Sequence, residues 1–189
     1  MKNFAKLIKL TLLVATSTVM FSCSDDDNAA PESNTIAAIA SRNPNFTTLV
    51  AALDRAGLVQ TLDQNGPFTV FAPTNAAFND FLADNGFTSL NDIPVDVLRE
   101  VLLNHVVNGT NLSTSLTTGY VKTLGKGSAS DSNTLSMFIN TASGVRLNGV
   151  ASVTTPDIVA SNGVIHVVDA VIGLPTVVTH AAANPGFST

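Results

Sequence analysis

The chain has 189 residues, of which 45% are hydrophobic, and it carries a formal net charge of −5. This length and hydrophobic content suffice for one domain with its own core. The acidic balance argues against nucleic-acid binding, which relies on Lys and Arg to neutralise phosphates. The single cysteine excludes an internal disulfide and a cysteine-based zinc cluster.

Residues 1–22 have the composition of an export signal that is removed from the mature protein. Three lysines precede the apolar stretch Leu10–Phe21, which is shorter than the ~20 residues that a membrane-spanning helix needs. The stretch ends in Ser22-Cys23, which resembles a bacterial lipobox with cleavage before Cys23 and lipid on its thiol. An ordinary secretory signal with an incidental cysteine is the alternative. We favour lipidation because the chain's one cysteine stands at the lipobox position.

Residues 23–34 form an acidic, polar segment. Ser24–Asp27 resembles an export signal of lipoproteins on the outer face of the outer membrane, so we expect a surface-exposed outer-membrane lipoprotein. A solvated, flexible tether explains the same composition, because such a segment cannot bury a core. Removing residues 1–22 takes away three lysines and no acid, which leaves six basic and fourteen acidic side chains and a net charge of −8. Lipid is then the expected attachment to the membrane.

The first half of the mature chain has the pattern of helices around one buried strand. Asn43-Pro44 predicts a helix start, because Asn caps a helix and Pro at its first position loses no hydrogen bond. Gly57 suits the end of this helix. Phe68–Ala72 reads as a short buried strand, and further helices are predicted after Pro73-Thr74 and from Pro94. The apolar positions at helical spacing are Phe46, Leu49, Val50, Leu53, Ala77, Phe78, Leu82, Leu98, Val101 and Leu102.

From His105 onward the hydrophobic period changes to two, which predicts strands. Leu135, Met137 and Ile139 alternate with polar neighbours, and glycines interrupt the strands. Helices therefore dominate the first half and strands the second. This order indicates an α+β fold rather than repeated βαβ units.

Three segments together resemble the fasciclin (FAS1) domain family. Gly66–Phe78 and Asn162–Asp169 are similar to its two signature segments, and Leu102–Val107 is similar to its Tyr-His segment. The resemblance covers roughly residues 35–175. It implies a wedge of two small β-sheets with several packed helices, and a role in adhesion or ligand contacts at a cell surface.

Two features bear on what the resemblance can transfer. The family has Tyr before the histidine of the Tyr-His segment, but this chain has Asn104, so an adhesive role through that tyrosine does not carry over. Asp157-Ile158 resembles a pair linked to integrin contact in animal members. Because a bacterium has no integrins, we expect Asp157 to shape a turn after Pro156 and Ile158 to fill the core, with partner contact as the alternative.

The polar residues of the signatures are expected to be structural. His105 and His166 lie in apolar runs without cysteine or a second histidine at zinc-site spacing. A buried histidine hydrogen-bonded to the backbone is therefore favoured over a metal or catalytic role. Thr74 is expected to cap the following helix, Asn75 to tie a loop, and Thr69 to act locally. The sequence predicts no catalytic residues, no metal site and no cofactor.

The last residues repeat the start of the domain. Residues 176–189 align without gaps on residues 35–48 at a constant offset of 141, with Thr, Ala, Asn, Pro and Phe among the identities. Similarity at a fixed period indicates a repeated module. We therefore expect residues 176–189 to be a stub of a second fasciclin domain, frayed because it lacks a continuing amphipathic face. The alternative is a tail that packs back on its own domain.

These patterns lead to two hypotheses of function. The favoured one is a non-enzymatic, lipid-anchored adhesion or protein-interaction module that contacts a surface protein or glycan. The alternative is a carrier that holds a lipid, pigment or glycan in an apolar cleft between the helices and the wedge.

Overall fold

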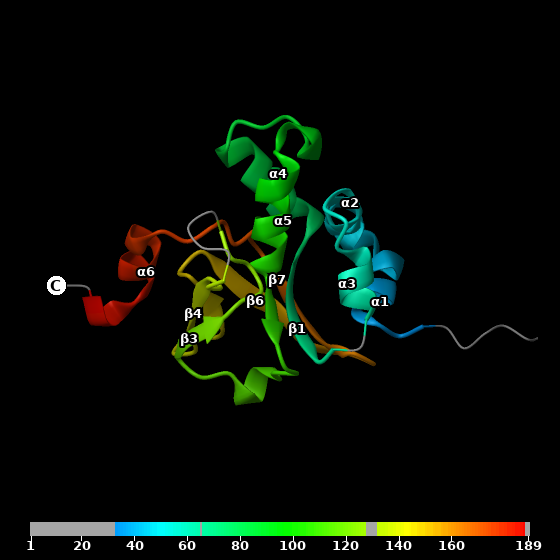
Figure 1. Ribbon diagram of the computed structural model, residues 1–189. Helices are drawn as coiled ribbons and strands as arrows, with labels where there is room; N and C mark the ends of the chain where they lie inside the picture. The colour runs from blue at the N-terminus through cyan, green and yellow to red at the C-terminus, as the bar shows by residue number, and fades with distance from the viewer. Residues whose placement is uncertain (1–32, 65, 128–131, 188–189) are drawn as a thin grey trace, which may run out of the picture. The chain divides into compact units, whose positions relative to one another are not determined.

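The computed structural model describes residues 33–64, 66–127 and 132–187, which lie in one structural unit that begins at Ser33. Helices come first along the chain and strands follow (Figure 1). In chain order the elements are α1 (Ile36–Arg42), η1 (Pro44–Phe46), α2 (Thr47–Arg55), α3 (Val59–Asp63), β1 (Phe68–Pro73), α4 (Asn75–Asp84), η2 (Leu90–Asp92), α5 (Val95–Leu103), β2 (Val106–Asn108), η3 (Ser113–Ser115), β3 (Gly119–Lys122), β4 (Ser136–Asn140), β5 (Arg146–Leu147), β6 (Ala151–Ala160), β7 (Gly163–Val168), α6 (Val177–Ala183) and η4 (Pro185–Phe187).

The helices of the first half pack together over one side of the sheet. Helices α1, α2 and α3 contact one another, and α2 also contacts α4 and α5; Figure 1 shows α1–α3 grouped beside β1. The apolar positions predicted from helical spacing form this core, in which Phe46, Phe78 and Leu98 are fully buried. The helix starts are also as predicted, because Asn43 and Thr74 accept hydrogen bonds from the first turns of η1 and α4.

The strands form one continuous sheet in the order β2-β1-β7-β6-β5-β4-β3. Strand β6 is long enough to pair with β7 along one part and with β5 along the other. The two small sheets implied by the family resemblance are therefore joined through β6. Strands β1 and β7 run parallel, and the other pairs are antiparallel.

The sheet curves until its two edge strands meet. Val107 of β2 pairs with Thr123, which follows β3, and the Leu124 N–H donates to the Val106 carbonyl oxygen at 2.8 Å. A second apolar core fills the space that the curved sheet encloses. Its buried members are Phe71, Val107, Met137, Ile139, Leu147, Ala151, Val168 and Ile172.

Several elements differ from the sequence prediction. Helices α1 and α3 were not predicted, and β6 was not recognised as a strand because it contains Pro156 and Asp157. The prediction that Asp157 shapes a turn is wrong. It lies inside β6, at an irregularity where the pairing with β7 shifts register between Thr155 and Ile158. The C-terminal residues form the capped helix α6 where frayed chain was expected.

Candidate functional site

A chain of hydrogen bonds connects three of the singled-out residues, Thr69, His166 and Asp157. The Asn111 backbone N–H and side-chain amide both donate to Thr69 Oγ1, at 2.9 and 3.0 Å. The Asn111 carbonyl oxygen lies 2.9 Å from His166 Nε2. On the other side of the ring, the Asp157 N–H donates to His166 Nδ1 at 3.2 Å. The loop after β2 is thereby fastened to β1, β6 and β7.

The hydrogen bonds of His166 define its tautomer. Because Nδ1 accepts from the Asp157 N–H, the ring proton must be on Nε2, where it is donated to the Asn111 carbonyl. The ring is fully buried and stacks on Phe71 with 5.4 Å between centroids. Both nitrogens are thus occupied, which confirms the expectation of a buried histidine bonded to the backbone.

Asp157 is held by Ser113. The Ser113 N–H donates to Asp157 Oδ1 at 2.7 Å, and the Ser113 hydroxyl donates to Oδ2. These hydrogen bonds, the hydroxyl one foremost, hold the pKa of the Asp157 carboxyl below its usual value. The backbone of Asp157 has a φ of 62°, in the left-handed region that Asp tolerates better than most residues. Ile158 is half-buried against the helical core.

Ser113, Asp157 and His166 do not form a nucleophilic triad. In such a triad the hydroxyl bonds to the imidazole, which in turn is oriented by the carboxylate. Here the Ser113 hydroxyl donates to the carboxylate, and both nitrogens of His166 are bonded to backbone groups. The arrangement fastens a loop and places no imidazole nitrogen beside the hydroxyl.

His105 occupies a second buried site, between α5 and β2. Its Nδ1 lies 2.7 Å from the Val101 carbonyl oxygen, and its Nε2 accepts from the Ile172 N–H at 2.8 Å. The proton therefore resides on Nδ1. Burial lowers the pKa of His105 to about 4, and the bond to Val101 offsets only part of this effect. The predicted buried, hydrogen-bonded His105 that leads into a buried strand is confirmed.

Asn104, which replaces the family's tyrosine, is fully buried. Its side-chain amide donates to the Gly173 carbonyl oxygen at 3.0 Å, and its Oδ1 accepts from the Thr123 hydroxyl at 3.2 Å. Asn104 thus forms an internal link between α5, the end of β3 and the segment after β7. This side chain takes no part in the outer surface.

Thr74 and Asn75 act at helix ends, as predicted. Thr74 Oγ1 accepts from the Ala77 N–H and caps α4. Asn75 Oδ1 accepts from the Thr48 N–H at 2.9 Å, and its amide donates to the Pro44 carbonyl oxygen at 2.9 Å. Asn75 therefore joins the start of α4 to the start of α2, as expected of a residue that ties a loop.

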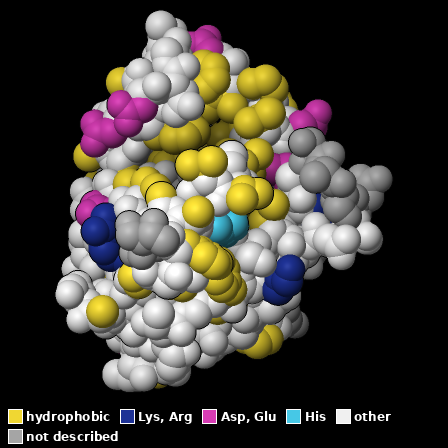
Figure 2. All heavy atoms as spheres, turned by 90° about the vertical axis from the view of Figure 1, so that its left-hand side faces the viewer, with side chains coloured by type: hydrophobic (Ala, Val, Ile, Leu, Met, Phe, Trp, Pro, Cys, Tyr) yellow, Lys and Arg dark blue, Asp and Glu magenta, His cyan; other side chains and the backbone are white. Residues whose placement is uncertain are grey.

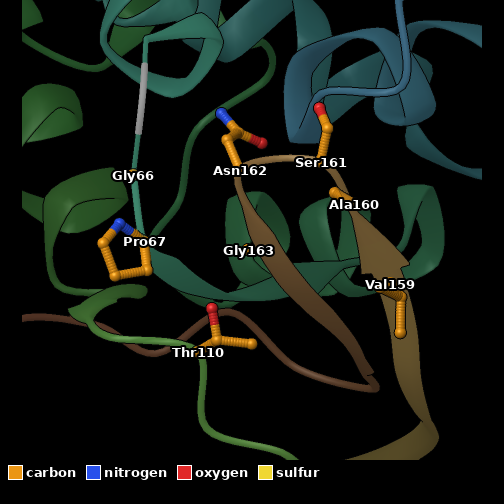
Figure 3. A pocket seen from close by; sticks show the side chains of 8 residues that line it. All are labelled: Gly66, Pro67, Thr110, Val159, Ala160, Ser161, Asn162 and Gly163. Atoms are coloured by element: carbon orange, nitrogen blue, oxygen red, sulfur yellow. The ribbon is translucent and has the colours of Figure 1, made fainter.

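An open depression of about 330 Å³ lies at the turn between β6 and β7. Figure 3 shows Pro67 on one side and Val159 on the other, with Thr110 between them. The nearby Asn162 amide donates to the Leu62 and Gln64 carbonyls, and its Oδ1 accepts from the Ile36 N–H, so its polar atoms are occupied inside the fold. Hydroxyl groups and an apolar rim suit a surface contact better than a reaction.

One small hollow lies within the second core. The hollow bounded by Phe71, Val107 and Ile139, within the second core, measures about 10 Å³, room for about one water molecule. Within residues 33–64, 66–127 and 132–187, no three His, Cys, Asp or Glu side chains are grouped so as to hold a metal ion. Over the same residues, no helix is both long and apolar enough to cross a bilayer.

The structure brings the singled-out residues to three places: Thr69, His166 and Asp157 in the first network, His105 alone, and Thr74 with Asn75. Sequence reasoning missed the roles of Asn111 and Ser113, which hold the first network together, and of Asn162, which ties the turn between β6 and β7 to α1 and to the end of α3. Their polar side chains in loops are not distinctive, because Asn and Ser are common in any loop. Cys23 and residues 1–32 lie outside the described residues.

Comparison with known proteins identifies the fold's relatives. The family model described as "Fasciclin domain" matches residues 44–175. The Synechocystis proteins sll1483 and sll1735 are 40% identical over 144 residues and 37% identical over 137 residues. These matches cover 76% of this chain and 76% of sll1483, and 72% of this chain and 96% of sll1735.

More distant relatives are animal proteins. The rabbit transforming growth factor-beta-induced protein ig-h3 is 31% identical over 137 residues, which are 72% of this chain and 19% of that protein. A solved FAS1 domain pair from the insect cell adhesion molecule Fasciclin I is 21% identical, with a TM-score of 0.48, over 73% of this chain and 50% of that one. On the family match and the bacterial relatives, this chain belongs to the fasciclin domain family.

Proposed function

We propose that this chain is a lipid-anchored, non-enzymatic module of the bacterial cell surface whose fasciclin domain binds another surface protein or a glycan. Members of the family take part in cell adhesion and protein interaction, occur in secreted or cell-surface proteins, and are generally non-enzymatic. The fasciclin domain itself carries the proposal.

The hydrogen bonding of the signature residues supports binding over chemistry. Thr69, His105 and His166 are buried, and their polar atoms are bonded to backbone or to Asn111. Thr74 and Asn75 cap helices. A general base or nucleophile needs a polar group presented to a substrate. Because the polar atoms of these residues are bonded within the protein, we expect the outer surface to contact the partner.

The sequence before Ser33 supplies the proposed attachment to the membrane. A mature chain of net charge −8 has no evident attraction to anionic headgroups. Acyl chains on Cys23 would supply the affinity instead, at about 0.8 kcal/mol for each buried methylene. The acidic segment 23–34 would then hold the domain away from the bilayer as a solvated tether.

The carrier alternative requires an apolar cleft of ligand size. The depression of about 390 Å³ lined by Val97, Arg99 and Leu174 is open to solvent, like the one at the turn between β6 and β7, whereas bound ligands of that kind are mostly enclosed. Surface contact is therefore the better supported proposal. Native mass spectrometry of the purified protein tests the alternative, which requires a stoichiometric small molecule that co-purifies.

Attachment assays with a strain that lacks the gene test the proposal. Complementation with the wild-type gene should restore attachment, and the Cys23→Ala gene should not, because the module would leave the cell surface. Adding the soluble mature domain should inhibit wild-type cells by competing for the partner. This competition separates loss of binding from loss of anchoring. Unchanged attachment of the deletion strain, together with no inhibition by soluble domain, would contradict the proposed function.

A further inference from the structure

The C-terminal segment repeats the first helical segment of the domain in three dimensions. Helix α6 and η4 have the bounds of α1 and η1, each displaced by 141 residues. Their caps are also the same. Thr35 and Thr176 each accept a hydrogen bond from the N–H three residues later, both at 3.2 Å. Asn43 and Asn184 each accept one from the N–H two residues later, at 3.0 and 2.9 Å.

The two copies differ in burial. Ile36 is 1% exposed and Phe46 is 0% exposed, whereas their counterparts Val177 and Phe187 are 85% and 64% exposed. Ala37 and Ala40 are buried as well, while Val178 and Ala181 are exposed. The residues that anchor α1 in a fasciclin core thus have apolar counterparts in α6 that nothing in the described structure covers.

Helix α6 contacts the domain through other side chains. The His180 ring packs on Tyr120 with 5.4 Å between centroids, and the Asn184 amide donates to the Tyr120 hydroxyl at 3.4 Å. Ala183 lies against Gly149, where an added Cβ would be 3.2 Å from the Ala183 Cα. Positions 180, 183 and 184 share one face of the helix.

Val177 and Ala181, four residues apart, border this face beside His180 and Asn184, and they are exposed, as is Val178. Figure 2, which views the side of the molecule where α6 lies, shows hydrophobic side chains grouped near the middle of this surface. The helix therefore contacts the domain through His180, Ala183 and Asn184, while the apolar side chains of Val177, Val178 and Ala181 stay exposed.

The first copy shows what covers such a face. Helix α1 packs against α2, α3 and β7. Its N-terminal end is also held, because the Ile36 N–H donates to Asn162 Oδ1 at 2.9 Å and the Thr35 hydroxyl donates to Asp63 Oδ1 at 2.7 Å. The C-terminal segment has the same cap as α1, followed by two aliphatic residues and a phenylalanine at the same spacing. It therefore suits the same kind of packing site.

We propose that α6 and η4 are the first helical segment of a second fasciclin module that follows on the same chain. The counterparts of α2, α3 and β7 in that module cover Val177, Val178, Ala181 and Phe187. Since α6 also contacts Tyr120 and Gly149, the helix belongs to both modules and fixes their orientation. A second copy of this chain fits less well as the occupant, because its own slot is already filled by α1.

A tandem built from the chain itself tests this proposal. Residue 189 corresponds to residue 48, so residues 49–175 are fused directly after Thr189 to complete a second module in register. Hydrogen exchange is then followed in residues 177–187, which occur once in the tandem. We expect their amides to exchange at least ~10-fold more slowly in the tandem than in the parent chain, because a packed core slows local opening.

Two substitutions sharpen the test. Phe187→Ala should return exchange in the tandem to the rate of the parent chain, because loss of a core phenylalanine lowers the folding equilibrium of a module by ~100-fold or more. In the parent chain, the same substitution should leave the urea midpoint of the domain unchanged. Ala182→Ser is the matched control, since its counterpart Ser41 is exposed, and it should preserve the slow exchange of the tandem.

Four outcomes would overturn the proposal. The first is equal exchange of residues 177–187 in tandem and parent. The second is protection of this segment in the monomeric parent as strong as that of α1, which would mean that it packs back on its own domain. The third is concentration-dependent dimerisation of the parent that protects Phe187. Sequencing of the gene beyond codon 189 should reveal residues that align with Leu49 onward, and a stop codon there would also overturn it.

Discussion

Acidification should weaken the folded domain through one buried imidazole, His105. Its pKa is about 4 in the folded state, compared with about 6.5 for an unperturbed histidine. Because the folded pKa lies below the unfolded one, the neutral ring's contribution to stability is fully present above pH 6.5. It is lost progressively as the pH falls toward 4. Linkage gives a loss of about 2 kcal/mol at pH 5 and about 3 kcal/mol once the pH is well below 4.

The structure explains why the charged ring is excluded. Protonation of His105 would place a proton on Nε2, where the Ile172 N–H now donates at 2.8 Å. Two donors would then face each other in a site with almost no exposure, and the lost acceptor would leave a buried N–H unpaired. An unsatisfied buried polar group costs about 1–3 kcal/mol, which is of the same order as the linkage value.

Urea unfolding of the wild type and of a His105→Gln variant, from pH 7.5 to pH 5, measures this effect. The variant should be less stable at pH 7.5, and His105→Ala should cost about 1–3 kcal/mol there. The difference between wild type and His105→Gln should then shrink by about 2 kcal/mol at pH 5, because only the wild type carries this titrating ring. The difference cancels the contributions of the other titrating groups. Parallel loss of stability in both proteins would refute the reasoning.

Three other changes test separate parts of the structure. Cys23→Ala should move the protein out of the membrane fraction or leave it unprocessed; a correctly cleaved variant that stays on membranes would place the anchor elsewhere. Gly163→Ala should cost at least about 2 kcal/mol in a urea melt, because its Cβ would collide with the Phe68 carbonyl. Ser113→Ala should raise the carboxyl pKa of Asp157 toward its usual value in an NMR titration, since the Ser113 hydroxyl is the main cause of its lowering; an unchanged pKa would mean that the bond is not formed.

Local signals in the sequence were sufficient for the elements that carry their own caps. Asn43 and Thr74 precede amphipathic runs, and η1 with α2 and α4 begin where these residues predict. Helix α3 escaped prediction because five residues are too few to establish a helical period. Its end is instead held by Asn162, 98 residues away from the Gln64 carbonyl that it contacts. A contact of that range leaves no local trace in the sequence.

Strand β6 and the hydrogen-bond network around His166 could not be predicted from the sequence either, for a different reason. Pro156 and Asp157 argue locally against a strand, yet the irregular pairing at Thr155–Ile158 absorbs them. The same irregularity turns the Asp157 N–H toward His166 and its carboxylate toward Ser113. Burial of His166 could be predicted from its apolar neighbours, but its partners depend on how three strands and a loop come together.

The pairing between β2 and the residues after β3 affects how the domain behaves when many copies are close together. An exposed strand edge is a template on which another chain can add a strand, and aggregation commonly begins there. In this domain the Val106 carbonyl and the Val107–Thr123 pair engage the two ends of the sheet with each other. Neighbouring molecules at high concentration would therefore find these backbone groups already paired, and would meet through side chains, whose chemistry can select a partner.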